Sequence, residues 1–192
     1  MDPGNAHKRA ARLLTDVLNP FFIFTALYAL VAFSEASASR AALYVSADLV
    51  AAVFVAGYVF LLRLRRRVGD FWISTRAERV MPAFVLLVAF VALLGSLVFL
   101  GAPGTLLRAT LSMGLASAAV TAATLLWKVS AHSAVAGHAA AAGLLVLGLP
   151  GLLFAFILPL VLWSRVVPGA HTLSQALTGA GVGAAFAFLF LA

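Results

Sequence analysis

The sequence predicts an all-α fold, a polytopic bundle of six to seven transmembrane helices, on three observations. Hydrophobic residues make up 64% of the 192 residues and charged residues only 10%, whereas a soluble domain is about half apolar and about a quarter charged. Apolar runs of roughly 20 residues, the length that a bilayer core requires, recur along the chain. Gly- and Pro-containing breaks separate several of these runs. We therefore expect one integral membrane domain, residues 1–192.

Each apolar run gives one expected helix. The first run, residues 13–34, contains Asn19-Pro20, which predicts a kink, and this run could instead lie at the membrane interface. Four further expected helices cover residues 41–62, 81–101, 105–127 and 172–191. The run 133–163 is broken at residues 149–151, so it forms either one kinked helix or a hairpin. Each arm of the hairpin would reach only about 20–25 Å at about 1.5 Å per residue, short of a ~30 Å bilayer core.

Charge and cysteine content narrow the possible functions. In a membrane protein, a net charge of +7 reflects the Lys and Arg residues that set its orientation and attract anionic lipid head groups. No nucleic-acid partner is therefore expected. The chain has no cysteine, which excludes disulfides and cysteine-based metal sites.

The Lys and Arg residues also predict the orientation in the membrane. With the hairpin arrangement, and leaving aside cations that could bind a ligand, one side carries seven: Lys8, Arg9, Arg12, Arg63, Arg65, Arg66 and Arg67. The other side carries two, Arg40 and Arg108. The side that holds residues 63–80, 128–132 and 164–171 is therefore predicted to be cytoplasmic, and we expect the protein to lie in the cell membrane.

Polar side chains gather in three short segments, each next to the end of an apolar run. The members are Arg76 and Arg79, then Lys128, Ser130 and His132, then Arg165, His171 and Gln175. Cations outnumber acids here, which favours a polyanion such as phosphate, because arginine offers forked donors to its oxygens and helix N-termini add backbone N–H groups.

Two histidines in these segments favour phosphoryl transfer over binding alone. One imidazole could act as a nucleophile and the other as a general acid, since the ordinary pKa of ~6.5 makes both roles accessible at neutral pH. Gln175 follows His171 by one helical turn, so it could hydrogen-bond the ring and orient it.

The segment Ser164–Gln175 resembles the third motif of the type-2 phosphatidic acid phosphatase superfamily, Ser-Arg-x5-His-x3-Asp. Ser164, Arg165 and His171 match in identity and spacing. Gln175 replaces the aspartate, and His-Thr followed by Gln is similar to the dolichyl and polyprenyl diphosphate phosphatase branch. The second family motif, Pro-Ser-Gly-His, is represented by Ser130 and His132 without the Pro and Gly.

The first family motif, Lys-x6-Arg-Pro, is represented only by Arg76, Arg79 and Pro82, and its spacing differs. The three motifs lie at residues 70–82, 128–132 and 164–175. A shared site requires His132 and His171 to lie on the same side of the membrane, which favours the hairpin.

The resemblance implies metal-independent catalysis without a cofactor. His171 would attack phosphorus to give a phosphohistidine, and His132 would protonate the leaving oxygen. The remaining site residues would hold the phosphate oxygens or support the histidines: Arg165, Lys128, Ser130, Arg79, Arg76, Gln175 and Ser164.

The expected function is therefore hydrolysis of a lipid phosphate or diphosphate, with a polyprenyl phosphate favoured and a phosphatidic-acid-like lipid next. The alternative is a transporter or binding protein for an anionic lipid or phosphate, to which the acid Asp48 within a span would contribute. A prenyltransferase is disfavoured because its magnesium-binding aspartate clusters are missing from a chain with six acids. The sequence leaves the oligomeric state open. His138 is expected to be a packing residue.

Overall fold

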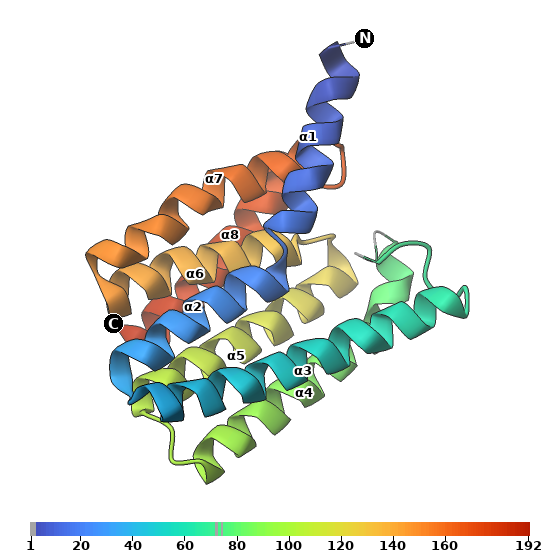
Figure 1. The fold of residues 1–192 in the computed structure, drawn as a ribbon. Helices are drawn as coiled ribbons and strands as arrows, with labels where there is room; N and C mark the ends of the chain where they lie inside the picture. The colour runs from blue at the N-terminus through green and yellow to red at the C-terminus, as the bar shows by residue number, and fades with distance from the viewer. Residues whose placement is uncertain (1–2, 72, 74) are drawn as a thin grey trace.

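A computed structural model describes residues 3–71, 73 and 75–192, and in this part of the chain it contains helices and no strand. The elements run along a bundle in which most helices are roughly parallel or antiparallel to one another (Figure 1). The α-helices are α1 (Pro3–Val17), α2 (Pro20–Glu35), α3 (Ala38–Leu64), α4 (Val80–Phe99), α5 (Gly104–Leu126), α6 (Ala131–Leu147), α7 (Leu152–Val166) and α8 (Leu173–Leu191). Two 3-10 helices, η1 (Arg76–Arg79) and η2 (Leu149–Gly151), precede α4 and α7.

The helices have the length and apolar character of membrane spans. Five qualify outright: α3, α4, α5, α8 and the segment Leu149–Val166, which contains α7. The bent pair of α1 and α2 would add a sixth, and α6 is a shorter apolar helix of 17 residues. The chain is thus an integral membrane protein, and the prediction of a polytopic helical bundle is confirmed.

The predicted kink at Asn19-Pro20 is a break between two helices. The axes of α1 and α2 differ by 44°, and α1 projects from the end of the bundle (Figure 1). Asn19 ends the run because its Oδ1 accepts from the Phe22 N–H at 3.0 Å, which caps α2. Pro20 then occupies the first helical position, where its missing N–H costs nothing. Helix α2 therefore begins at Pro20, and α1 and α2 qualify as a span only together, as this bent pair.

The segment 133–163 folds as the predicted hairpin. Gly148 leaves α6 with a φ of +63°, a conformation that glycine adopts without steric cost. The 3-10 helix η2 then reverses the chain into α7, and Gly151 packs so closely that a Cβ there would lie 2.0 Å from the Gly143 carbonyl oxygen. The start of α6 and the end of α7 consequently lie at the same end of the bundle (Figure 1).

Helices α6 and α8 pack through glycines that allow their backbones to touch. A Cβ at Gly179 would lie 2.3 Å from the Ser130 carbonyl oxygen, and one at Gly183 would lie 1.9 Å from that of Ala134. Such approach is the property that small residues spaced by four give to membrane helices. The contact sets the N-terminus of α8 against the N-terminus of α6, where the Ser130 N–H donates to the Gln175 carbonyl oxygen at 3.3 Å.

We predict that Gly183→Ala lowers the stability of the protein by about 1–3 kcal/mol, because the added methyl group forces two backbones apart. Gly181→Ala is the matched control: the same helix has open space at Gly181, so the change should be neutral or stabilising by up to about 1 kcal/mol. Thermal unfolding in detergent measures both. Equal stability of the two variants would contradict the close α6–α8 contact.

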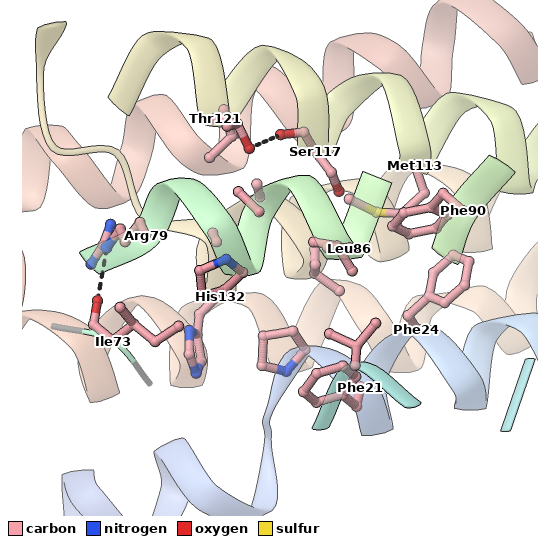
Figure 2. Close-up of a pocket in the computed structure, with 18 of the residues that line it drawn as sticks. Phe21, Phe24, Ile73, Arg79, Leu86, Phe90, Met113, Ser117, Thr121 and His132 are labelled. Carbon is pink, nitrogen blue, oxygen red and sulfur yellow. Dashed lines mark hydrogen bonds between the residues drawn. The ribbon is translucent and has the colours of Figure 1, made fainter. Parts of the chain in front are cut away.

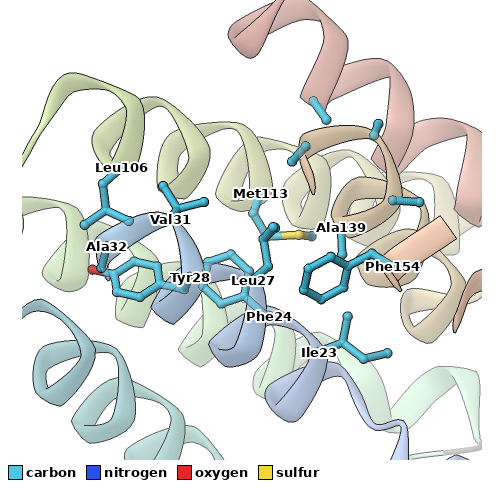
Figure 3. Close-up of a cluster of buried hydrophobic side chains, with 14 of the residues drawn as sticks. Ile23, Phe24, Leu27, Tyr28, Val31, Ala32, Leu106, Met113, Ala139 and Phe154 are labelled. Carbon is cyan, nitrogen blue, oxygen red and sulfur yellow. The ribbon is translucent and has the colours of Figure 1, made fainter. Parts of the chain in front are cut away.

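The apolar core fills the end of the bundle away from η1. Large buried side chains from α2, α5 and α7 meet there, among them Leu27 and Tyr28 of α2, Met113 of α5 and Phe154 of α7 (Figure 3). These side chains are less than 2% exposed, so this half of the bundle is closely packed.

Candidate functional site

Most of the predicted site residues converge at the end of the bundle that holds η1. They come from four places: η1, the α5–α6 connection, the end of α7 and the α7–α8 connection. The residues brought together there are Arg79, Lys128, Ser130, His132, Arg165 and His171. Segments separated by up to about a hundred residues in the chain thus meet, as a shared site for the three motifs requires.

The first turn of α6 carries two of these residues. Ser130 caps the helix: its Oγ accepts from the Ser133 N–H at 3.3 Å and from the Ser133 Oγ at 2.9 Å. Because Ser130 accepts in both bonds, its own hydroxyl proton is not used by them and can serve an anion. His132 is the second residue of the helix and lines the cavity described below. The helix N-terminus adds partial positive charge at the same place.

Arg79 is held by backbone carbonyls. Its Nε donates to the Ile73 carbonyl oxygen at 2.8 Å and its Nη1 to that of Val129 at 3.4 Å. Ile73 has a φ of +49°, and its carbonyl oxygen accepts the hydrogen bond from Arg79. The backbone of Arg76 lies in η1, but its side chain lies outside the described part, so its predicted role stays a prediction.

The α7–α8 connection places His171 over the end of α7. The His171 N–H donates to the Arg165 carbonyl oxygen at 3.0 Å, which closes the loop into a tight turn with Gly169 at a φ of +76°. Lys128 fixes the turn from outside, since its Nζ donates to the Ala170 carbonyl oxygen at 2.9 Å. Both His171 and Arg165 are 6% exposed, so they face the interior rather than solvent.

Sequence reasoning missed Thr15 of α1, which contacts the site arginine. The Thr15 Oγ1 accepts from the Arg165 Nη1 at 3.3 Å and donates to the carbonyl oxygens of Ala11 and Ser164. Ala11, Thr15 and Asn19 are buried although the rest of α1 is largely exposed. Their spacing of four residues puts them on one face of a charged helix, and this pattern was the signal in the sequence for a buried face of α1. Helix α1 therefore closes the site rather than crossing the membrane by itself.

Two buried nitrogen atoms of the site have no hydrogen-bond partner within the described residues, Arg165 Nε and His171 Nδ1. A buried polar group without a partner costs about 1–3 kcal/mol, and such groups are rare in folded proteins. An anion between Arg165 and His171 would satisfy both.

Ser164 and Gln175 lie beside the site. The Ser164 Oγ donates to the Val161 carbonyl oxygen at 2.8 Å within α7. Gln175 and Thr172 form a capping box, in which the Thr172 N–H donates to the Gln175 Oε1 at 3.1 Å. The Gln175 side chain also interacts with the His171 ring, which raises the pKa of His171 and only partly offsets the opposite effects of burial and the cations. Gln175 thus starts α8 next to His171, and its orienting role stays a prediction.

The site is strongly electropositive. Burial and the nearby Arg165, Lys128 and Arg79 lower the pKa of His171 to about 3. The pKa of Lys128 is lowered by burial and by the two arginines, while Asp70 acts in the opposite direction. At neutral pH His171 is therefore unprotonated, the form in which a ring nitrogen can attack phosphorus.

The lowered pKa of His171 gives a pH prediction. Between the ordinary pKa of about 6.5 and the folded value of about 3, the unfolded chain binds a proton at this ring and the folded protein does not. The stability that a neutral His171 provides is complete above pH ~6.5 and is lost as the pH falls toward 3. We expect the unfolding temperature to fall over this range less steeply in His171→Asn than in the parent. Identical slopes would contradict the buried neutral ring.

An apolar cavity of about 260 Å³ starts at these residues and runs into the bundle between α2, α3, α4, α5 and α6. Figure 2 shows Arg79 and His132 at one end of it and Phe24, Phe90 and Met113 at the other, with Phe21 and Leu86 between. The cavity thus joins a cationic end at the edge of the membrane domain to an apolar interior.

Two other polar residues of the spans have structural partners. The Thr25 Oγ1 donates to the Asp48 Oδ2 at 2.6 Å, a bond that links α2 to α3 beside the cavity. His138 packs fully buried against α5, with its Nε2 2.7 Å from the Ser112 Oγ. The expectation that His138 is a packing residue is confirmed.

Comparisons with known proteins do not identify a family or a function for this site. No protein-family model, no curated protein and no solved structure matches this chain. Among the residues that the structure describes, no group of three or more His, Cys, Asp or Glu side chains could hold a metal ion. The function must therefore be argued from the cations, imidazoles and cavity themselves.

Proposed function

We propose that the protein is a membrane lipid phosphatase that hydrolyses a phosphate or diphosphate ester of a lipid, with a polyprenyl phosphate favoured. The observation that carries the proposal is the direct continuity of a buried cationic site with an apolar cavity inside a membrane domain. A phosphate head group fits the first and a hydrocarbon chain fits the second. The motif resemblance of Ser130, His132, Arg165 and His171 to type-2 phosphatidic acid phosphatases supports the same chemistry.

The mechanism uses the two histidines in turn. A neutral ring nitrogen of His171 attacks phosphorus, the bond from phosphorus to the lipid oxygen breaks, and His132 gives a proton to that oxygen as it leaves. A water molecule then attacks the phosphohistidine, gives its proton to His132 and releases inorganic phosphate. His132 begins protonated, loses its proton in the first step and regains it in the second, so the full cycle restores both histidines and needs no co-reactant other than water.

The cations supply the electrostatic stabilisation. Arg165, with its unpaired Nε, and Lys128 lie next to His171, where negative charge gathers on the phosphoryl oxygens in the transition state. Arg79 and the N-terminus of α6 approach from the side of His132. Protein cations thus take the part that a metal ion plays in many phosphatases.

Transport of an anionic lipid or phosphate is the second function considered. Asp48, an acid within a span, lines the cavity, and a second hollow between α3 and α4 shares Ala51, Ala89 and Leu93 with its deep end. A carrier would bind the phosphate ester without hydrolysing it, so phosphate release distinguishes the two functions.

The test is phosphate release by the purified protein from a panel of lipid phosphates in the presence of EDTA. The panel holds prenyl phosphates and diphosphates, monoacyl and diacyl phosphatidic acids, and a water-soluble sugar phosphate as a control. We expect turnover of at least one lipid, unchanged by EDTA and inhibited by vanadate. Binding without release from every lipid would favour the carrier, and strict magnesium dependence would contradict the mechanism.

The excess of Lys and Arg supports a cytoplasmic location of the site, a proposal that single cysteines can test. Ser174 is exposed at the end of the bundle that holds the site, and Ser39 is exposed at the other end. Because the chain has no cysteine of its own, an impermeant thiol reagent should label Ser174→Cys from the cytoplasm and Ser39→Cys from outside. The reverse pattern would place the site on the outer face.

A further inference from the structure

The cavity has cationic side chains at one end and a floor of large apolar side chains at the other, and this arrangement limits the substrate. At the level of the head group it is lined by Arg79, His132, Arg165 and His171. At the other end lie Phe24, Phe90 and Met113 (Figure 2). Phe24 and Phe90 meet edge to face with ring centroids 5.6 Å apart, so the floor is made of interlocked side chains.

The length of the cavity corresponds to one leaflet. On α4 its lining runs from Val80 to Leu93, which is about 20 Å of helix at about 1.5 Å per residue. Half of a bilayer core of about 30 Å is about 15 Å. A chain that enters with its phosphate among the cations therefore reaches the floor after about the length of an ordinary membrane-lipid chain.

The volume suits one chain rather than two. About 260 Å³ lies just below the range of about 300–1,000 Å³ that pockets for drug-sized ligands occupy. In the wall of the cavity, the hydrogen-bonded pair of Thr25 and Asp48 joins α2 to α3 and limits widening between them, because pushing the helices apart would break this bond inside the membrane.

The floor cannot yield easily. Phe24 is 9% exposed and Met113 1% exposed, and both belong to the packed core shown in Figure 3. Phe90 is partly buried and packs against the core beside α5, where a Cβ at Gly114 would lie 3.4 Å from its side chain. Forcing an extra methylene into such packing costs enough to change an affinity about tenfold.

We propose that the cavity binds a single hydrocarbon chain and that Phe90, supported by Phe24 and Met113, sets the longest chain that it accepts. The inference rests on the proposed function and specifies its substrate class as one-chain phosphate esters, such as alkyl, monoacyl or short prenyl phosphates. In a membrane the chain gains little by leaving the lipid for the cavity, because both are apolar. Selection by length must therefore come from the fit at the floor.

The experiment offers a mixture of straight-chain alkylphosphonates, shorter to longer than one leaflet, to the protein in lipid nanodiscs, and native mass spectrometry reads which lengths stay bound. Phosphonates are not hydrolysed, so the result is independent of catalysis. We expect an optimum length, with longer chains depleted about tenfold, and weak retention of a two-chain phosphatidic acid.

Two variants move the floor in opposite directions. Phe90→Ala should shift the optimum to longer chains, and Leu86→Trp, which fills the middle of the cavity, should shift it to shorter ones. Phe84→Ala is the matched control, because Phe84 lies on the same helix but is 61% exposed and faces the lipid. The opposite shifts keep the test decisive even if one variant does not fold.

The outcomes separate this inference from the proposed function. An optimum at the same length in all variants, or a two-chain lipid retained as well as the best single chain, would overturn the chain limit. Length-selective binding without phosphate release from any lipid would leave the chain limit standing and refute the phosphatase. Phosphate release at equal rates from every chain length would support the phosphatase and refute the chain limit.

Discussion

Replacing His171 by alanine should reduce phosphate release by at least about a thousandfold, the largest effect expected of any single change. A covalent mechanism has no route without its nucleophile, and the remaining cations bind phosphate without transferring it. The removed ring is 6% exposed and lies near the Arg165 side chain, and the other imidazole of the site, His132, has the separate role of protonating the leaving oxygen. Steady-state release from the best lipid of the panel measures the effect.

The control for this change is His7→Ala, because His7 is exposed on α1, away from the cavity. Full activity is expected there. Folding of the His171 variant is checked by its unfolding temperature and by retention of an alkylphosphonate. A folded His171→Ala protein with more than a tenth of the parental rate would remove His171 from the chemistry.

Replacing His132 by alanine should slow release from a lipid phosphate by about 10²–10⁴-fold, the usual contribution of a general acid. The effect should depend on the leaving group. An alkyl oxygen needs a proton as it departs, whereas the oxygen of a nitrophenyl phosphate is a weak base and leaves without one. We therefore expect the variant to keep most of its activity on the aryl ester.

Equal losses on the alkyl and aryl esters would contradict the acid role. They would instead indicate that His132 supports the start of α6, where it is buried behind the Ser130 cap. His132→Gln, which keeps a polar side chain of similar reach, separates the two roles. A structural contribution would be restored by glutamine, and proton donation would not.

The spans could be predicted from the sequence because length and apolarity are sufficient in a membrane. The ends of α5 and α8, the turn at Gly148 and the hairpin to α7 fall where Gly, Pro and polar residues interrupt the apolar runs. The start of α2 could not be placed, because the capping by Asn19 depends on a hydrogen bond and not on hydropathy.

The convergence of the site was predictable only in part. Arg165 and His171 are six residues apart, so one turn brings them together, and the hairpin adds His132. The contact between Thr15 and Arg165 joins residues 150 positions apart, and nothing in local spacing encodes it. The capping box of Thr172 and Gln175 was missed because Gln175 lies within one helical turn of both Thr172 and His171, so the sequence offers it two partners.

The cavity was invisible in the sequence for a similar reason. Its lining residues alternate along five helices with residues that face lipid or core, and both kinds are apolar. When the surrounding solvent is hydrocarbon, hydropathy does not distinguish residues that line a cavity from residues that pack against another helix. Only the packing of α3 against α2 and α4 shows where space remains.

Detection of the phosphorylated intermediate tests the central claim most directly. The purified protein is mixed with a lipid whose phosphate is radiolabelled, quenched in alkali within the first turnovers, digested and examined by mass spectrometry. The mechanism predicts a base-stable, acid-labile phosphate on His171, absent from His171→Ala. Phosphate release without any labelled peptide, or with the label on another residue, would contradict the mechanism.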